Sequence, residues 1–212
     1  MRALALRKHR ARLLVFGCGR DSGFWARVMN RHGTTVFLED NPQWARFDRN
    51  LTAHVVRYRT APMHAWRQRL QQSDRSLSLP ARFRDALEMD GVPAGLFEQW
   101  WDVVLVDAPN GGQDAPYYSW VPDRIMEPYA HPGRLAPIYQ AARLLARQRA
   151  QRPCARVDVF VHDFNRWTEK EASLLFLAPH ARLANYEGIV QDGRPDTKGS
   201  PNGTYMAWFH AP

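Results

Sequence analysis

The sequence predicts a single α/β domain, built as a mostly parallel sheet with helices on both faces. Three observations lead to this prediction. Five short apolar runs have the continuous hydrophobicity of strands that are buried on both faces. Helical patterns separate these runs, as in a doubly wound sheet. The chain has 212 residues, 45% of them hydrophobic, which suits one domain of ordinary size over residues 1–212.

The expected strands and helices alternate through the first half of the chain. Residues 21–33 fit one crossover helix, with Gly33 as its C-terminal cap. Asn41 and Pro42 are the residue types preferred as N-cap and first residue of a second helix. Residues 61–99 carry no clear motif. The five strands are expected at 12–17, 34–39, 54–59, 101–108 and 156–163.

The second half of the chain adds two helices and a terminal pair of strands. Helical periodicity covers residues 132–151 and 165–178. Two further strand candidates, 182–190 and 204–211, are joined by a polar, glycine-rich segment. This hairpin-like pair predicts an antiparallel edge at the C-terminal end of the sheet.

Charge and composition restrict the partners and the compartment. The chain has 29 Lys and Arg against 21 Asp and Glu, a formal charge of +8, which favours an anionic partner such as an acidic sugar, a phosphate or a nucleic acid. The two cysteines, Cys18 and Cys154, do not form a disulfide framework and allow a reducing compartment. No apolar stretch reaches the roughly 20 residues that span a bilayer. We therefore expect a soluble, cytoplasmic chain with no membrane partner.

The loop after the first strand predicts a cofactor site. Gly17 and Gly19 allow a sharp turn and a close approach of the backbone to a ligand. A helix that begins near Asp21 or Ser22 would point free N–H groups at that ligand. Glu39 ends the second strand, where a carboxylate can accept both hydroxyls of a ribose. The pattern fits NAD and S-adenosylmethionine alike, and it also fits a purely structural turn.

Two details favour the methyl donor over the dinucleotide. The third small residue of G-x-G-x-x-G is absent, because position 22 is serine and Gly23 falls one place late. The fourth strand ends in "VDAPNGG", which places Asp107 at the crevice of the sheet, beside the expected cofactor.

Six separated stretches together resemble a known family. "LVFGCGRDSGFW", "TTVFLEDNPQW", "RYRT", "WDVVLVDAPNG", "HPGRLAPIYQAARLLARQR" and "DVFVHDFNR" are similar, in order and spacing, to the plant polysaccharide-biosynthesis methyltransferases typified by glucuronoxylan 4-O-methyltransferase. The resemblance covers residues 13–170. It implies a Rossmann-like class I methyltransferase fold, S-adenosylmethionine as donor, a glucuronate hydroxyl as acceptor and a divalent metal ion to be considered.

The chain departs from this family pattern at two places. The stretch "QDAPYYSWVPDRIMEPYAH" is added between the counterparts of Asp107 and Pro132, which are close together in the plant enzymes. The plant chains also have an amino-terminal membrane anchor and further cysteines, and we expect this chain to have neither. The different loop leaves the acceptor open between an acidic sugar and another small molecule.

Three residues at strand ends are candidates for the chemistry. Asp107, His162 and Asp163 follow adjacent strands and are expected to face one crevice, where any of them could take the proton of an acceptor hydroxyl. Asp107 and Asp163 could instead hold a magnesium or manganese ion, since hard cations prefer oxygen ligands. A structural role is the third alternative.

The acceptor site is expected beside these residues. Arg134 begins a helix near the crevice and could bind a carboxylate through two parallel hydrogen bonds. Tyr117 and Tyr118 in the added loop could form a wall for a sugar or an aromatic acceptor, and ordinary loop packing is the alternative.

Three functions fit these patterns. The first is an O-methyltransferase that acts on an acidic sugar or another small hydroxyl compound. The second is a nucleic-acid methyltransferase, which the basic charge supports, although the chain has neither a separate RNA-binding module nor the D/N-P-P-Y/W signature. The third is a non-catalytic relative that acts as a binding or scaffold protein. Loss of cofactor binding would leave four residues without a purpose, which argues against this function: Gly17, Gly19, Glu39 and Asp107.

Overall fold

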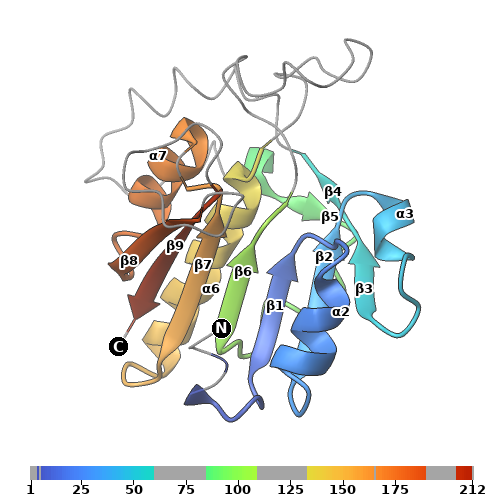
Figure 1. The fold of residues 1–212 in the computed structure, drawn as a ribbon. Coiled ribbons are helices and arrows are strands. Elements are labelled where there is room, and N and C mark those ends of the chain that lie inside the picture. Colours follow the sequence, from blue (N-terminus) through green and yellow to red (C-terminus); the bar gives the residue numbers. More distant parts are fainter. Residues whose placement is uncertain are drawn as a thin grey trace.

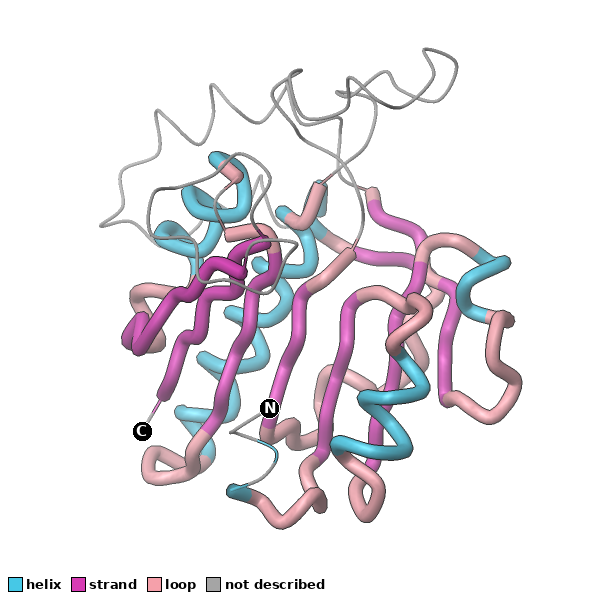
Figure 2. Tube along the Cα trace, viewed as in Figure 1, coloured by secondary structure: helices cyan, strands magenta, loops and turns pink. Residues whose placement is uncertain are grey.

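Seven strands lie side by side in one sheet, in the order β3-β2-β1-β6-β7-β9-β8 (Figures 1 and 2). The computed structural model describes residues 4, 6–59, 85–108, 133–164, 166–189 and 204–211. The strands of the sheet are β1 (Arg12–Phe16), β2 (Thr34–Glu39), β3 (Thr52–Val55), β6 (Val103–Val106), β7 (Val157–His162), β8 (Arg182–Ile189) and β9 (Thr204–Ala211).

The five strands from β3 to β7 are parallel, which confirms the predicted sheet. Val15 of β1 pairs with Phe37 of β2 on one side and with Leu105 of β6 on the other. β9 runs antiparallel to β7, and β8 runs antiparallel to β9, so the predicted antiparallel element is also present. The chain moves outward from β1 to β2 and β3 in one direction, and from β6 to β7 in the other. The crevice of the sheet therefore lies beyond the carboxyl ends of β1 and β6.

Helices cover both faces of the sheet (Figure 1). α6 (Leu135–Gln151) and α7 (Trp167–Phe176) pack on one face, where Ile138 joins a core with Leu14 and Val104. α2 (Ser22–Phe24) continues into a π-helical segment, η1 (Trp25–Met29), on the other face, where Met29 packs on a core that contains Leu13. Neighbouring residues such as Leu13 and Leu14 contact different cores, which explains why the central strands are largely apolar.

Buried amides attach these helices to the sheet. Gln148 of α6 accepts a hydrogen bond from the N–H of Trp101, at 2.6 Å, and donates one to its carbonyl, at 3.0 Å. Asn30, directly after η1, accepts from the N–H of Ala11 and donates to the Ala11 carbonyl. Each amide thereby satisfies backbone groups at the entry to a central strand.

Some elements differ from the sequence prediction. The crossover helix ends at Met29, and Gly33 is not its cap: it lies against the Ala11 carbonyl, where a Cβ would collide. The strand expected at 54–59 divides at Val56 into β3 and β4 (Arg57–Tyr58), because β4 leaves the main sheet. β4 pairs with β5 (Met89–Asp90), which follows the short 3-10 helix η2 (Asp85–Leu87).

The predicted start of the second helix is confirmed. Asn41 caps α3 (Pro42–Ala45), and its side-chain oxygen accepts from the N–H of Gln43 at 2.9 Å. Cys18 and Cys154 are both free. Among the residues that the structure describes, no helix combines the length and the apolar character needed to cross a membrane.

Candidate active site

Gly17 shapes the turn that follows β1. Its φ is +116°, a conformation that side chains with a Cβ rarely adopt. A Cβ at this position would lie 2.8 Å from the Cβ of Ala108, just beyond β6. Only glycine therefore lets the loop after β1 pass this closely to the end of β6.

The rest of the glycine loop is held by its own hydrogen bonds. The N–H of Gly19 donates to the hydroxyl of Ser22 at 2.8 Å, and the buried Ser22 returns a backbone bond to the Gly19 carbonyl. Asp21 accepts from the indole N–H of Trp25 at 2.8 Å. Gly19 has no positive φ, so the backbone conformation alone does not require glycine there. Asp21 and Ser22 thus fix the loop, and direct cofactor contact remains a prediction for both.

Glu39 joins the end of β2 to the glycine loop. One carboxylate oxygen accepts from the N–H of Cys18 at 2.6 Å, and the other accepts from the N–H of Asn41 at 2.8 Å. A carboxylate has about four acceptor positions, so each oxygen retains one for a further donor. The side chain is 5% exposed, and burial raises its pKa to about 7 although the two backbone bonds act in the opposite direction.

The cradle fits a ribose diol, which is the group expected of the cofactor. Glu39 offers two acceptor positions next to a backbone that only glycine permits. Nearby, the buried hydroxyl of Tyr58 has no hydrogen-bond partner within the described ranges. Burial raises the pKa of Tyr58, and the charges of Asp40 and Glu39 raise it further. An unsatisfied buried hydroxyl close to this carboxylate is consistent with a site that receives a polar ligand.

The structure brings Asp107, His162 and Asp163 together, as the strand ends predict. Nδ1 of His162 lies 3.0 Å from Oδ1 of Asp107 and 3.3 Å from Oδ2 of Asp163. Neither contact has hydrogen-bond geometry, so the attraction is that of an ion pair. Asp107 is the most accessible of the three, with 37% of its side chain exposed against 25% for His162 and 12% for Asp163.

Arg134 lies in the middle of this group and is 3% exposed. One terminal nitrogen donates to Oδ2 of Asp163 at 2.7 Å, and the other donates to the backbone carbonyl and Oδ1 of Asp107 at 2.9 and 3.2 Å. Arg134 thus binds two carboxylates of the chain itself through one hydrogen bond each, instead of one carboxylate through two parallel hydrogen bonds. These contacts favour a role in positioning Asp107, and binding of an acceptor carboxylate by Arg134 stays a prediction.

Two residues of the cluster, Arg166 and Glu169, are not anticipated by the sequence reasoning. Glu169 is completely buried, with Oε1 3.4 Å from Arg134. Arg166 places a terminal nitrogen 2.8 Å from Oδ2 of Asp163. The sequence signal for this pair was its spacing of three residues at the start of α7, because residues at i and i+3 lie on the same face of a helix.

The charges of the cluster fix its protonation. Burial alone would lower the pKa of His162, but the Asp107 and Asp163 carboxylates outweigh it and raise the pKa to about 9. His162 is therefore an imidazolium near neutral pH. Burial would raise the pKa of Asp163, yet His162 and the two arginines hold it well below its usual range. Burial raises the pKa of Glu169, partly offset by Arg134 and Arg166.

Asp163 has an unusual backbone, with φ of +55°. Aspartate tolerates this left-handed region better than most residues, at a cost of order 1 kcal/mol or more. The conformation turns the chain out of β7, and the carboxylate lies within reach of His162, Arg134 and Arg166. The ion pairs of the cluster stabilise this turn.

The predicted metal ligands do not fit a cation. Oδ1 of Asp107 and Oδ2 of Asp163 face Arg134 and His162, so a metal ion between them would meet two positive charges. In the described part of the chain, no group of three or more His, Cys, Asp or Glu side chains could hold a metal. Tyr117 and Tyr118, the expected acceptor wall, lie outside the described residues.

Comparison with known proteins gives this site a context. Residues 1–191 match the family model described as IRX15/IRX15L/GXM. Glucuronoxylan 4-O-methyltransferase 2 of Arabidopsis thaliana is 36% identical over 179 residues, which are 81% of this chain and 55% of that one. Arabinogalactan O-methyltransferase 2 of the same plant is 35% identical, over 77% of this chain and 54% of that one.

The chain thus spans about half the length of the curated relatives it matches. Among solved structures, a TehB-like SAM-dependent methyltransferase from Corynebacterium glutamicum is similar with a TM-score of 0.45 and 13% identity, over 98% of this chain and 84% of that one. The family model covers most of the chain, including the glycine loop, Glu39 and the charged cluster. The chain therefore belongs to the IRX15/IRX15L/GXM family.

Proposed function

We propose that this chain is an S-adenosylmethionine-dependent O-methyltransferase that methylates a hydroxyl group of an acidic sugar, within one domain of residues 1–212. The observation that carries the proposal is the arrangement at the carboxyl ends of β1, β2, β6 and β7. A buried carboxylate, held by two backbone N–H groups, lies at the ends of β1 and β2, and a cluster of carboxylates around His162 lies at the ends of β6 and β7. The names of both relatives support a sugar acceptor, and the glucuronoxylan name and the positive net charge support one that carries a carboxylate.

The cofactor would be held by Gly17 and Glu39. The backbone at Gly17 allows close approach, and Glu39 accepts hydrogen bonds from ribose hydroxyls. When bound, S-adenosylmethionine supplies a methyl group on a sulfonium, whose sulfur keeps the electron pair of the breaking bond. The chain itself must then hold the acceptor hydroxyl in line and take its proton.

Asp107 is the residue best placed to take that proton. Its Oδ1 contacts Arg134 and His162, whereas Oδ2 has no hydrogen bond within the described residues, and the side chain is 37% exposed. The acceptor proton passes to Oδ2 while the acceptor oxygen forms the new bond to carbon. Asp163 is a poorer base, because three cations stabilise its ionised form.

His162 then acts as a positioning imidazolium rather than as the base. Its Nδ1 lies between two carboxylates, which raise the pKa of the imidazole to about 9, so His162 is protonated at neutral pH. Arg134 orients Asp107 from the other side through both a carbonyl and a carboxylate contact. Together, His162 and Arg134 hold Oδ1 of Asp107 and leave Oδ2 free in a fixed position.

A pH–rate profile with labelled donor tests these roles. Asp107→Asn should reduce kcat by about 100-fold or more, the usual contribution of a general base, with S-adenosylhomocysteine affinity nearly unchanged. At saturating donor, the wild-type kcat should be level between pH 7 and 8. A rate that rises tenfold per pH unit towards 9 would make His162 the base instead.

An acceptor screen tests the substrate class. Glucuronate-bearing oligosaccharides should be methylated, and the matching neutral glucosides should not. Methylation of only uncharged compounds would contradict the acidic-sugar assignment, and methylation of RNA or DNA would replace it. Failure to bind S-adenosylhomocysteine would contradict the enzyme assignment and leave a binding protein.

A further inference from the structure

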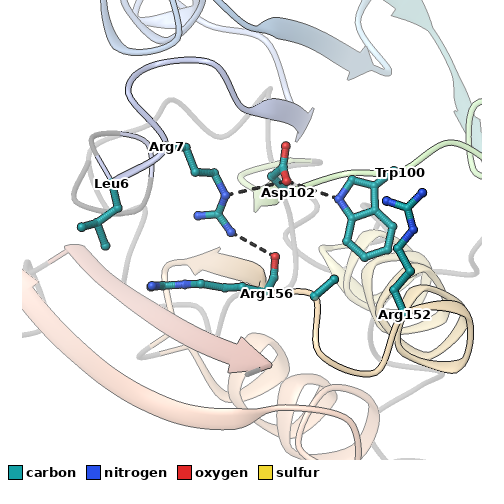
Figure 3. Close-up of a pocket in the computed structure, with 7 residues that line it drawn as sticks. Leu6, Arg7, Trp100, Asp102, Arg152 and Arg156 are labelled. Atoms are coloured by element: carbon teal, nitrogen blue, oxygen red, sulfur yellow. Dashed lines mark hydrogen bonds and ion pairs between the residues drawn. The ribbon is translucent and has the colours of Figure 1, made fainter.

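A cavity lies at the amino ends of the strands, at the opposite end of the sheet from the candidate active site. It has a volume of about 420 Å³ and is lined by Leu6, Arg7, Trp100, Asp102, Arg152, Ala155 and Arg156 (Figure 3). Asp102 precedes β6 and Arg156 precedes β7, so the cavity stands at the amino ends of these strands. Five residues of extended chain separate Asp102 from Asp107, or roughly 17 Å. The cavity is therefore not an extension of the catalytic crevice.

Three arginines make this pocket basic. Arg7 is engaged, with a terminal nitrogen 2.7 Å from Oδ2 of the buried Asp158 and another donating to the carbonyl of Arg156. Arg156 shares Asp158, through Nε at 3.3 Å. Asp158 is thus already paired twice, and it also contacts His210.

Arg152 provides the charge that is left without a counter-ion. Its guanidinium lies over the ring of Trp100, 5.0 Å from the ring centroid. In the part of the chain that the structure describes, this guanidinium makes no hydrogen bond or ion pair. The stacking contact restricts the exposed guanidinium to a position beside the cavity. Binding of an oxyanion there would therefore cost little side-chain entropy.

Asp102 distinguishes this pocket from a general phosphate site. Its Oδ1 accepts from the indole N–H of Trp100 at 3.2 Å, and its Oδ2 accepts from the backbone N–H of Arg12 at 2.8 Å. Oδ1 also lies 3.8 Å from Nε of Arg7, whereas Oδ2 retains acceptor capacity, and 27% of the side chain is exposed. A wall carboxylate repels a polyanion but accepts hydrogen bonds from hydroxyl groups.

The ligand must therefore combine one negative charge with hydroxyl donors and small apolar surfaces. Leu6 and Ala155 supply the apolar part of the wall, and the volume lies within the range of small-ligand sites. We propose that this pocket binds a uronate, a sugar residue whose carboxylate pairs with Arg152 and whose hydroxyls donate to Asp102. The proposal rests on the pocket alone and does not require the methyl transfer proposed above.

Trp100 allows a test that reports on this pocket only. Its indole N–H lies on Asp102, so the ¹H–¹⁵N indole signal, assigned with Trp100→Phe, should shift when the pocket is filled. Methyl glucuronide should shift this signal in the intact chain, and methyl glucoside, its neutral counterpart, should not. Arg152→Gln should require roughly tenfold more glucuronide for the same shift, as expected for the loss of a charge-assisted hydrogen bond.

Controls separate this proposal from simpler explanations. Arg49→Gln removes an exposed arginine in the loop before β3 and should respond like the wild type. An equal response to methyl glucoside, or equal displacement by inorganic phosphate, would overturn the uronate assignment. An unchanged response in Arg152→Gln would overturn the site. Binding of S-adenosylhomocysteine, measured on the same samples, reports separately on the proposed function.

Discussion

Replacement of Glu39 by glutamine tests the cofactor cradle directly. The carboxylate accepts from the N–H groups of Cys18 and Asn41 at 2.6 and 2.8 Å, and it should accept from a ribose diol as well. The amide of Glu39→Gln places an NH₂ group where one of these acceptors stood. Loss of a hydrogen bond to a charged group costs about 1.5–3 kcal/mol, which corresponds to a roughly 10- to 150-fold weaker affinity for S-adenosylhomocysteine.

The pKa of Glu39 gives this prediction a pH dependence. Burial raises that pKa to about 7, so the empty site is largely ionised at pH 8 and largely protonated at pH 6. Ribose hydroxyls donate to the ionised form, so affinity should fall as the pH falls. The competent fraction changes from about nine-tenths to about one-tenth, which predicts a nearly tenfold increase in the apparent Kd from pH 8 to pH 6.

Calorimetric titration at pH 6, 7 and 8 measures both effects. Glu39→Gln should bind weakly and without this pH dependence. Glu98→Gln is the matched control, because Glu98 is exposed in the loop before β6, and it should keep the wild-type profile. If Glu39→Gln binds as tightly as the wild type at pH 8, Glu39 is not the ribose acceptor. If the affinity of the wild type does not change between pH 6 and pH 8, the carboxylate of Glu39 does not titrate in this range.

Three further predictions concern stability, measured by urea denaturation. Gly17→Ala should destabilise the chain by about 1–3 kcal/mol and abolish S-adenosylhomocysteine binding, because φ is +116° and a Cβ would lie 2.8 Å from the Cβ of Ala108. Gly19 has no positive φ, so Gly19→Ala should destabilise the chain less. Equal destabilisation by the two substitutions would contradict this explanation. The pKa of His162 is raised from 6.5 to about 9, so its stabilisation is present below pH 6.5 and is lost as the pH rises through 9. His162→Gln should remove up to about 3 kcal/mol of this pH-dependent stability, and a difference from wild type that stays constant over pH 6.5–9 would refute the ion-pair assignment. Glu169→Gln should destabilise by about 3–5 kcal/mol, since it leaves the buried Arg134 with less compensating charge, and a change below 1 kcal/mol would show that Glu169 is already protonated.

The strand pattern predicted most of the sheet, because strands covered on both faces are apolar at most positions. The same rule could not show where one strand ends and a second sheet begins, as happens at Val56 between β3 and β4. The crossover helix was expected to reach Gly33. The helix instead ends at Met29, after a π-helical segment. The periodicity of the side chains does not predict this backbone geometry.

The sequence predicted the positions of those site residues that lie at the ends of strands. Asp107 and His162 follow neighbouring parallel strands, and their proximity is confirmed. Arg166 and Glu169 were missed, because charged residues on an amphipathic helix usually face solvent, and burial by the tertiary fold is not visible in the pattern. Arg134 shows the same limit: the sequence indicates a carboxylate-binding arginine but does not say whose carboxylates it binds.

The place of β9 in the sheet has a consequence for how the chain is made. β8 is synthesised first, but among the described residues it pairs only with β9, and β9 in turn pairs with β7. During translation β8 therefore emerges without its partner, and the exposed side of β7 stays open until residues 204–211 leave the ribosome. Synthesis at about 5–20 residues per second makes this an interval of roughly a second or more, in which β7 presents an unpaired edge to other chains. A stalled chain that lacks β9 would present that edge permanently, which makes it a substrate for chaperones and proteases even though the parallel strands from β3 to β7 are complete.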